Sequence, residues 1–133
     1  MTALETVRRM YAAFAAKDRD EILRLFDPRI VWVQNAGFPG GGAHVGAEAV
    51  FEVFAGFRRN WEGWTAEVAE WLEAGDTVVA IGEYAGTYKA TFRPMRAAFA
   101  GVYDVRDGRI VRFRQFTDTA KIAEAVGLMR AQP

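Results

Sequence analysis

The chain has 133 residues, of which 51% are hydrophobic and 26% are charged, and 17 basic residues balance 17 acidic ones. A chain of this length and composition forms one domain that buries about two-thirds of its unfolded surface, so intrinsic disorder is excluded. Without a net positive charge, nucleic acid is a poor partner. The absence of cysteine and the single histidine, His44, exclude disulfides, thiolate chemistry and a histidine-rich metal site.

No stretch of the sequence indicates a membrane segment, a leader or a cofactor. The longest apolar runs fall short of the roughly 20 residues that span a bilayer, and residues 1–5 lack the basic start of a signal peptide. The glycine-rich stretch over residues 37–42 matches neither a dinucleotide fingerprint nor a phosphate loop. We therefore expect a cytoplasmic protein without metal or cofactor, which binds neither membranes nor nucleic acid.

Three helices are predicted in the first half of the chain. Apolar residues at helical spacing predict a first helix over residues 4–14, and Asp18 begins a short second helix that Pro28 ends. Residues 30–35 alternate as a strand, followed by a glycine-rich loop that carries the histidine. A third helix is predicted over residues 47–61, and its aromatic face is typical of a core or of the wall of a ligand cavity.

The second half of the chain is predicted to be rich in strands. Four strands are expected at Thr65–Glu73, Thr77–Ala90, Ala97–Arg106 and Arg109–Thr117, and a short helix begins at Asp118. The Asp-Gly pair between the last two strands is a strong hairpin signal. Helices followed by antiparallel strands indicate an α+β fold, in which a curved sheet wraps partly around its helices and encloses an apolar cavity.

Six segments, which together span nearly the whole chain, carry a resemblance to known proteins: Tyr11–Phe14, Leu25–Pro28, Val33–Asn35, Gly46–Val50, Gly101–Ile110 and Arg114–Asp118. With the order of the elements, they resemble the nuclear transport factor 2-like superfamily, and within it the SnoaL-like branch of polyketide cyclases, ketosteroid isomerases and limonene-epoxide hydrolases. The resemblance implies one SnoaL-like domain over residues 1–133 with a cystatin-like architecture. A cone-shaped, strongly curved, mixed or antiparallel sheet would wrap around three N-terminal-half helices, with a short C-terminal helix. Because this fold hosts enzymes, binding modules and assembly domains, it leaves the activity open.

The resemblance also implies where relatives keep their proton-transfer groups, and this chain lacks them. The carboxylate base of the isomerases falls on Asn35, and their tyrosine and protonated aspartate fall on Met10 and Gly101. The cyclases keep an aspartate at the position of Gln115 and a histidine at that of Gly101. Tyr11, one residue from Met10, is a candidate substitute for the missing tyrosine.

The resemblance to the epoxide hydrolases also implies catalytic positions that this chain does not fill. Their Asp-Arg-Asp set falls on Gln115, Gly82 and Tyr84, and their water-holding pair falls on Val33 and Asn35, so only the asparagine is retained. The resemblance therefore implies a fold whose three known reaction schemes are each incomplete in this chain.

Strand alternation predicts which residues face the cavity. If Asn35 and Tyr84 face inward, the inner surface is mostly apolar and aromatic, the profile of a site for a small, largely uncharged molecule. In an enzyme, Asn35 and Gln115 would polarise a carbonyl or hold a water, Tyr84 would donate a hydrogen bond and His44 would move a proton. The residues expected to bind the ligand are Tyr11, Phe14, Val33, Phe54, Trp61, Phe99, Tyr103 and Phe113.

Three functions remain open at this stage. The first is an isomerase-, cyclase- or hydrolase-type enzyme acting on a small apolar metabolite, and the second is a binding module without chemistry. The third is a structural or assembly domain that forms a dimer or a heteromer, with a homodimer expected, through the outer face of the sheet, where Glu83, Asp104, Arg112 and Arg114 are expected. A filled core, in which Asn35 and Gln115 satisfy each other, is the alternative to a cavity.

Overall fold

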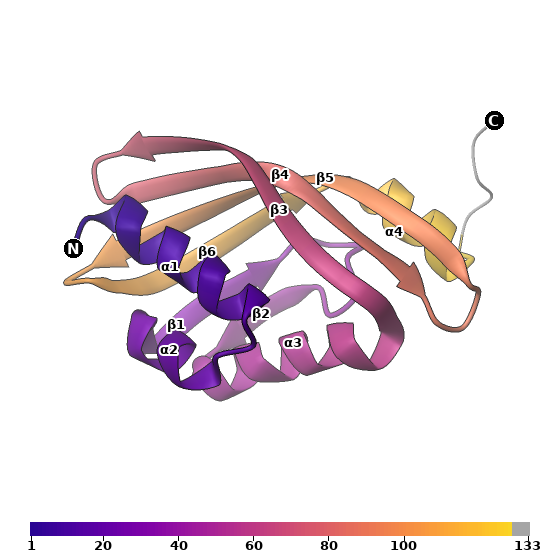
Figure 1. Cartoon of the computed structure of the whole chain (residues 1–133), viewed down its shortest axis with the longest axis horizontal. Coiled ribbons are helices and arrows are strands. Elements are labelled where there is room, and N and C mark those ends of the chain that lie inside the picture. The colour runs from indigo at the N-terminus through magenta and orange to yellow at the C-terminus, as the bar shows by residue number, and fades with distance from the viewer. Residues whose placement is uncertain (129–133) are drawn as a thin grey trace.

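The structure, a computed structural model, describes residues 1–128, and the last five residues of the predicted domain, 129–133, lie outside the described part. Within residues 1–128 there are four helices and six strands (Figure 1). In chain order they are α1 (Ala3–Ala15), α2 (Arg19–Leu25), β1 (Phe26–Gln34), β2 (Gly42–Val45), α3 (Ala47–Asn60), β3 (Trp61–Ala74), β4 (Thr77–Tyr88), β5 (Arg93–Arg106), β6 (Arg109–Thr117) and α4 (Thr119–Val126). None of the helices in this described part is long and apolar enough to cross a lipid bilayer.

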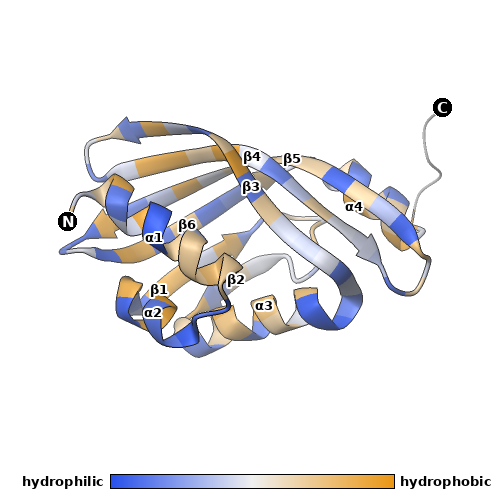
Figure 2. Cartoon of the chain, in the orientation of Figure 1, coloured by the Kyte–Doolittle hydropathy of each residue, from blue (hydrophilic) through white to orange (hydrophobic). Residues whose placement is uncertain are grey.

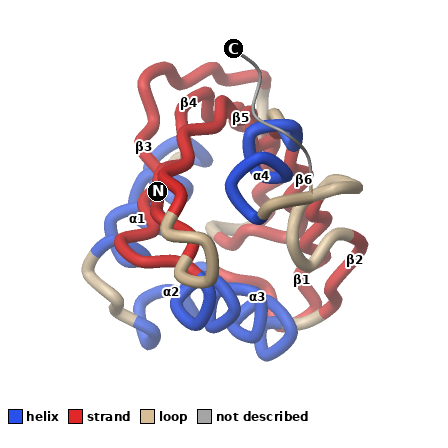
Figure 3. The backbone as a smooth tube through the Cα atoms, turned by 90° about the vertical axis from the view of Figure 1, so that its right-hand side faces the viewer, coloured by secondary structure: helices blue, strands red, loops and turns tan. Residues whose placement is uncertain are grey.

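The six strands form one mixed sheet in the order β2-β1-β6-β5-β4-β3. All neighbours pair antiparallel except β1 and β6, which are parallel. Seen end-on, the sheet curves around the space occupied by α1 and α3, and α4 covers the end where the chain leaves β6 (Figure 3). The two edge strands, β2 and β3, do not pair, so the sheet remains open. The predicted cone-shaped α+β fold is confirmed.

Side-chain capping bonds mark the start of α1 and of α2, but not of α4. The Thr2 hydroxyl accepts a hydrogen bond from the Glu5 backbone N–H at 3.1 Å, and the Glu5 carboxylate accepts one from the Thr2 N–H at 3.4 Å, which is a capping box. Asp18 caps α2 by accepting from the Glu21 N–H at 3.1 Å. Asp118 occupies the N-cap position of α4, but its side chain makes no capping bond.

Hydrophobic residues alternate along the strands, and one face of the sheet packs on the helices (Figure 2). The helical side of the core comes mainly from α3, where Val50, Phe54 and Phe57 are buried. The sheet contributes fully buried side chains such as Tyr103 and Phe113. These residues lie on the faces that the helical and strand periodicities predict.

The opposite face of the sheet carries the charged residues expected there. The Arg96 side chain donates to Glu83 at 2.8 Å, and the Thr77 hydroxyl donates to Asp104 at 2.8 Å. Asp104 lies opposite Arg112 in the pairing of β5 with β6. The carboxylates on these strands are therefore engaged on the outer surface.

Two prolines lie inside strands rather than between elements. The second helix ends at Leu25, and β1 begins at Phe26 instead of residue 30, so Pro28 is a strand residue. The pairing of β1 with β6 shifts register after Phe26, and such an irregularity accommodates a residue without an N–H. Pro94 is the second residue of β5, a strand-end position that proline also tolerates.

The predicted loop after the glycines contains a strand that the sequence does not reveal. Residues 42–45 form β2, and His44 lies on it opposite Trp32 of β1. The expectation that His44 lies in a loop was wrong. Four residues that include a glycine show too little alternation to predict a strand, and this one exists because β1 offers a free edge.

Candidate functional site

A channel enters the molecule between α1, α3 and β3. Its outer part has a volume of about 460 Å³, and a smaller inner cavity of about 40 Å³ lies behind it. The two hollows adjoin each other and share part of their lining, on α1, α3 and β3. The shared residues are Tyr11, Phe14, Phe54, Phe57, Trp64 and Ala66.

Flat aromatic pairs form the walls of the channel. The Phe57 and Trp64 rings stack with centroids 4.4 Å apart and an interplanar angle of 13°. Tyr84 stacks on Phe99 at 4.1 Å and 10°. Such walls are rigid and apolar, and their faces match those of a planar ligand.

The inner cavity has a polar group at the end of β1. Gln34 is only 2% exposed, and the Trp32 indole N–H donates to its side-chain oxygen at 3.0 Å. The Gln34 side-chain nitrogen is buried and has no hydrogen-bond partner among the described residues. Buried amide groups nearly always find partners, so this NH₂ group is an unmet donor on a residue that lines the inner cavity.

A second glutamine stands behind Tyr84 and is fully engaged. The Gln115 side-chain NH₂ donates to the Tyr84 hydroxyl oxygen at 3.1 Å, and the Gln115 side-chain oxygen accepts from the Asn35 backbone N–H at 3.1 Å. Tyr84 is the acceptor in its bond, so its own hydroxyl proton is free to donate. Gln115 therefore orients Tyr84, whose ring lines the inner cavity.

Two further phenols meet at the same cavity. The hydroxyl oxygens of Tyr11 and Tyr103 are 2.7 Å apart, and either can be the donor. Since one proton joins the two oxygens, the other hydroxyl proton is available to a third group. Gly101 makes room for this pair, because a Cβ at that position would lie 2.9 Å from the Phe113 ring and 3.1 Å from the Tyr103 ring.

The three phenols stay protonated over the physiological pH range. Burial raises the pKa of Tyr11, of Tyr84 and of Tyr103 above the usual value near 10, because the phenolate would lose its hydration. The Tyr11–Tyr103 hydrogen bond lowers the pKa of Tyr11 by less than burial raises it. The inner end of the channel therefore presents hydrogen-bond donors: the Gln34 amide, the Tyr84 hydroxyl and one hydroxyl of the pair.

The structure gathers most of the predicted ligand-binding residues in this channel. Phe99 stacks on Tyr84, and the Gln115 side chain donates a hydrogen bond to the Tyr84 hydroxyl. Trp61 instead lines a separate hollow. The predicted residues that line the channel directly are Tyr11, Phe14, Phe54, Tyr84, Tyr103 and Phe113.

The predicted inward face of β1 was wrong. Ile30, Trp32 and Gln34 are buried, whereas Val33 and Asn35 lie on the other side of the strand and are only partly buried. Both faces of β1 carry apolar residues, so alternation defines two sets without showing which one faces the helices. The interior amide at the end of this strand is therefore Gln34, which the sequence reasoning missed.

Asn35 has a structural role at the end of β1. Its side-chain oxygen accepts from the Thr117 backbone N–H at 2.9 Å, and its NH₂ donates to the Ala36 carbonyl at 3.2 Å. These bonds tie the end of β1 to the end of β6. Asn35 and Gln115 meet through the Asn35 backbone, and their side chains do not bond to each other.

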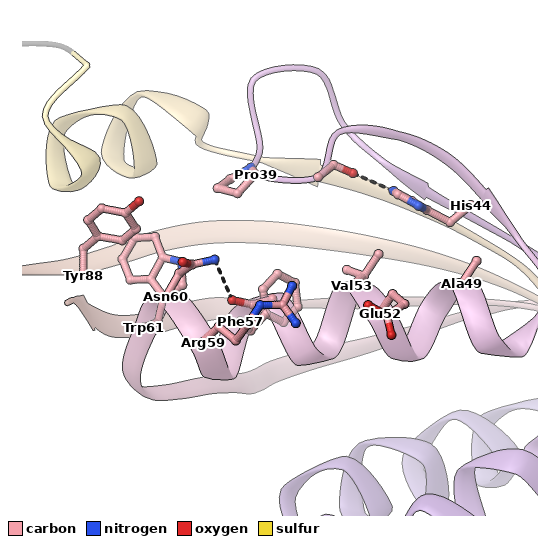
Figure 4. Close-up of a pocket in the computed structure, with 12 residues that line it drawn as sticks. Pro39, His44, Ala49, Glu52, Val53, Phe57, Arg59, Asn60, Trp61 and Tyr88 are labelled. Carbon is pink, nitrogen blue, oxygen red and sulfur yellow. Dashed lines mark hydrogen bonds between the residues drawn. The ribbon is translucent and has the colours of Figure 1, made fainter. Parts of the chain in front are cut away.

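His44 lies in a different hollow, on the other side of α3 (Figure 4). This hollow has a volume of about 330 Å³ and includes Glu52, Arg59 and Trp61. The His44 ring Nε2 hydrogen-bonds the Gly40 carbonyl at 2.6 Å. His44 therefore does not reach Tyr84 and Gln115, and the residues expected to act together are divided between two places.

Comparisons with known proteins agree with this architecture. The family described as SnoaL-like domain matches residues 7–113. The uncharacterized protein YesE of Bacillus subtilis is 27% identical over 128 residues, covering 94% of this chain and 87% of YesE. A crystal structure of a nuclear transport factor 2-like protein from Burkholderia thailandensis is 35% identical, with a TM-score of 0.91 over 100% of this chain and 99% of that one. TerC, co-crystallized with polyporic acid, is 26% identical, with a TM-score of 0.85 over 94% of this chain and 98% of TerC. The chain belongs to the SnoaL-like family.

Proposed function

We propose that the channel binds a small, largely uncharged, planar molecule that places an acceptor oxygen, such as a carbonyl, in the inner cavity. The observation that carries this proposal is the buried Gln34 NH₂ without a partner in an otherwise aromatic cavity. Leaving such a donor unpaired costs about 1–3 kcal/mol, and a ligand oxygen bonded to it removes that cost. The free protons of Tyr84 and of the Tyr11–Tyr103 pair favour the same kind of group.

The dimensions of the channel support a ligand of this kind. The outer part, at about 460 Å³, lies within the usual range of small-molecule pockets, roughly 300–1,000 Å³. The inner cavity, at about 40 Å³, has room for one small group, since a water molecule occupies about 30 Å³ in the liquid. The relative TerC was co-crystallized with polyporic acid, which supports small-molecule binding by proteins of this shape.

Binding without proton abstraction fits the residues of the inner cavity better than catalysis does. Its described lining includes aromatic, aliphatic and amide side chains but no carboxylate or imidazole, and proton-transfer catalysis is mostly performed by those groups. The alternative is an isomerase-, cyclase- or hydrolase-type reaction, in which Tyr84 and the Tyr11–Tyr103 pair would polarise the ligand carbonyl.

The test is a fluorescence titration with prodan, a planar naphthalene dye carrying a ketone, and with its analogue that lacks the propionyl group. We expect prodan to bind with a shift of its emission to shorter wavelength, and to bind more tightly than the analogue. Ala66→Phe, which narrows the channel where its two parts meet, should abolish binding. Ala69→Phe, at an exposed position of the same strand, is the control and should bind like the wild type.

The proposal fails if the protein binds neither dye nor any member of a panel of planar ketones and quinones. It also fails if Ala66→Phe binds prodan as the wild type does, because the dye would then lie outside the channel. Conversion of a bound ketone to a new product would support the catalytic alternative.

The outer face of the sheet favours a second role, assembly with another copy of the chain. Phe116 on this face is 55% exposed. A second copy would cover this ring. Light scattering should then show a dimer for the wild type and for Phe92→Glu, a control in the exposed turn after β4, but a monomer for Phe116→Glu. A monomeric wild type would contradict this role.

A further inference from the structure

The mouth of the channel differs in charge from its interior. Three basic residues line it, Lys17, Arg19 and Arg58, together with one acidic residue, Glu67. From this arrangement we infer that the ligand, although uncharged over the apolar body that fills the channel, ends in one carboxylate, which Lys17 and Arg58 hold at the mouth. The inference rests on the proposed function and adds the chemical group that the ligand carries at the mouth of the channel.

Lys17 occupies a position that favours glycine. Its N–H bonds to the Phe14 carbonyl at 3.1 Å and the Asp18 N–H bonds to the Ala13 carbonyl at 2.9 Å, which forms a Schellman motif at the end of α1. The residue at this point of the motif takes a left-handed conformation, and Lys17 has φ 57°. Only glycine adopts that conformation without strain. A lysine held there indicates a use for its side chain, which lines the mouth.

The other charges at the mouth are already neutralised or turned away. Arg19 donates two hydrogen bonds to Glu48, at 3.0 and 3.2 Å, and its guanidinium lies 4.0 Å from the centre of the Phe51 ring. Glu67 follows Ala66 on β3 and pairs with Glu83, whose carboxylate bonds to Arg96 on the outer face. Alternation along the strand directs the Glu67 side chain toward that outer face, so Glu67 borders the mouth only as a residue at its edge.

Lys17 and Arg58 therefore supply the uncompensated charge at the mouth. Neither makes an ion pair with a carboxylate in the described residues. Lys17 follows the end of α1, and Arg58 lies in the last turn of α3, so the two cations come from the two helices that border the channel. A ligand with its acceptor oxygen at the inner donors and a carboxylate at this rim would be complementary at both ends.

The test compares two dyes with the same ring system. Anilinonaphthalenesulfonate carries an anion, and phenylnaphthylamine is its neutral counterpart; both fluoresce when they leave water. Since both cations are exposed, we expect the anionic dye to bind about 3- to 10-fold more tightly, with a preference that shrinks at high salt. In the double variant Lys17→Gln/Arg58→Gln the preference should disappear, while the affinity for the neutral dye stays the same.

The control removes two charges elsewhere. Arg106→Gln/Arg109→Gln changes two exposed cations beside the β5–β6 turn, far along the chain from the mouth, and should leave the preference intact. The inference is overturned if both dyes bind equally to the wild type, or if the control variant loses the preference as the mouth variant does. Such a result leaves the proposed function standing, because the neutral dye still binds. If neither dye binds and prodan does not bind either, or if Ala66→Phe does not weaken binding, the proposed function fails with it.

Discussion

Replacing Gln34 by leucine tests the unmet donor in the cavity. The side chain is 2% exposed, and leucine has a similar volume without polar atoms. Removing the unpartnered NH₂ relieves a cost of about 1–3 kcal/mol. In the wild type the Trp32 indole N–H donates to the Gln34 side-chain oxygen, and leucine leaves this N–H without an acceptor, which costs about the same. We therefore expect the free energy of unfolding of Gln34→Leu to stay within about 1 kcal/mol of the wild type.

Gln115 provides a matched comparison, because it is also a glutamine with 2% exposure. Both ends of its side chain are bonded, to Tyr84 and to the Asn35 backbone N–H, so leucine there removes two bonds and relieves nothing. We expect Gln115→Leu to destabilise the protein by about 2–4 kcal/mol.

The assay is urea unfolding followed by tryptophan fluorescence, together with prodan titration of each variant. Gln34→Leu should keep its urea midpoint while its affinity for prodan falls about 5- to 30-fold, the effect of losing one buried hydrogen bond of about 1–2 kcal/mol. If Gln34→Leu loses as much stability as Gln115→Leu, the Gln34 NH₂ is bonded within the protein, and the reasoning behind the proposed ligand is refuted.

Three further predictions concern stability, measured by urea unfolding. Lys17→Gly should stabilise the protein by about 0.5–1 kcal/mol, because glycine relieves the left-handed strain; a loss of stability would contradict this. Gly101→Ala should destabilise it by about 1–3 kcal/mol, because the new Cβ lies 2.9 Å from the Phe113 ring; an unchanged midpoint would show that the ring moves freely. Burial raises the pKa of Tyr11, of Tyr84 and of Tyr103, so above pH 10 the unfolded chain releases phenol protons that the folded protein keeps. These groups should not change the free energy of unfolding below the pKa of the unfolded chain. Above that pKa the free energy of unfolding should fall by about 1.4 kcal/mol per pH unit for each phenol. A free energy of unfolding that stays constant from pH 9 to 11 would contradict this.

The parts of the fold that depend on local signals could be predicted from the sequence. The capping pairs Thr2–Glu5 and Asp18–Glu21 fix where α1 and α2 begin, because they satisfy backbone donors within one turn. The turn at Asp107 needs a left-handed conformation, and this residue has φ 52° in the structure. Signals of this kind act over a few residues and do not depend on the rest of the chain.

The candidate site depends on contacts between distant segments, and its prediction was incomplete for that reason. Alternation in β1 separates Trp32 and Gln34 from Val33 and Asn35, but only packing against the helices decides which pair is inside. On β4 and β5 one face is richer in small or aromatic residues, and the inward positions of Tyr84 and Tyr103 were predicted correctly. His44 was misplaced because β2 exists only through its pairing with β1.

A crystal structure of the protein with prodan bound tests the central claim most directly. The account predicts the dye between the stacked rings of the channel, with its ketone oxygen about 3 Å from the Gln34 side-chain nitrogen. A ketone that points to solvent, or a Gln34 NH₂ bonded to a protein group with the dye bound elsewhere, would contradict it.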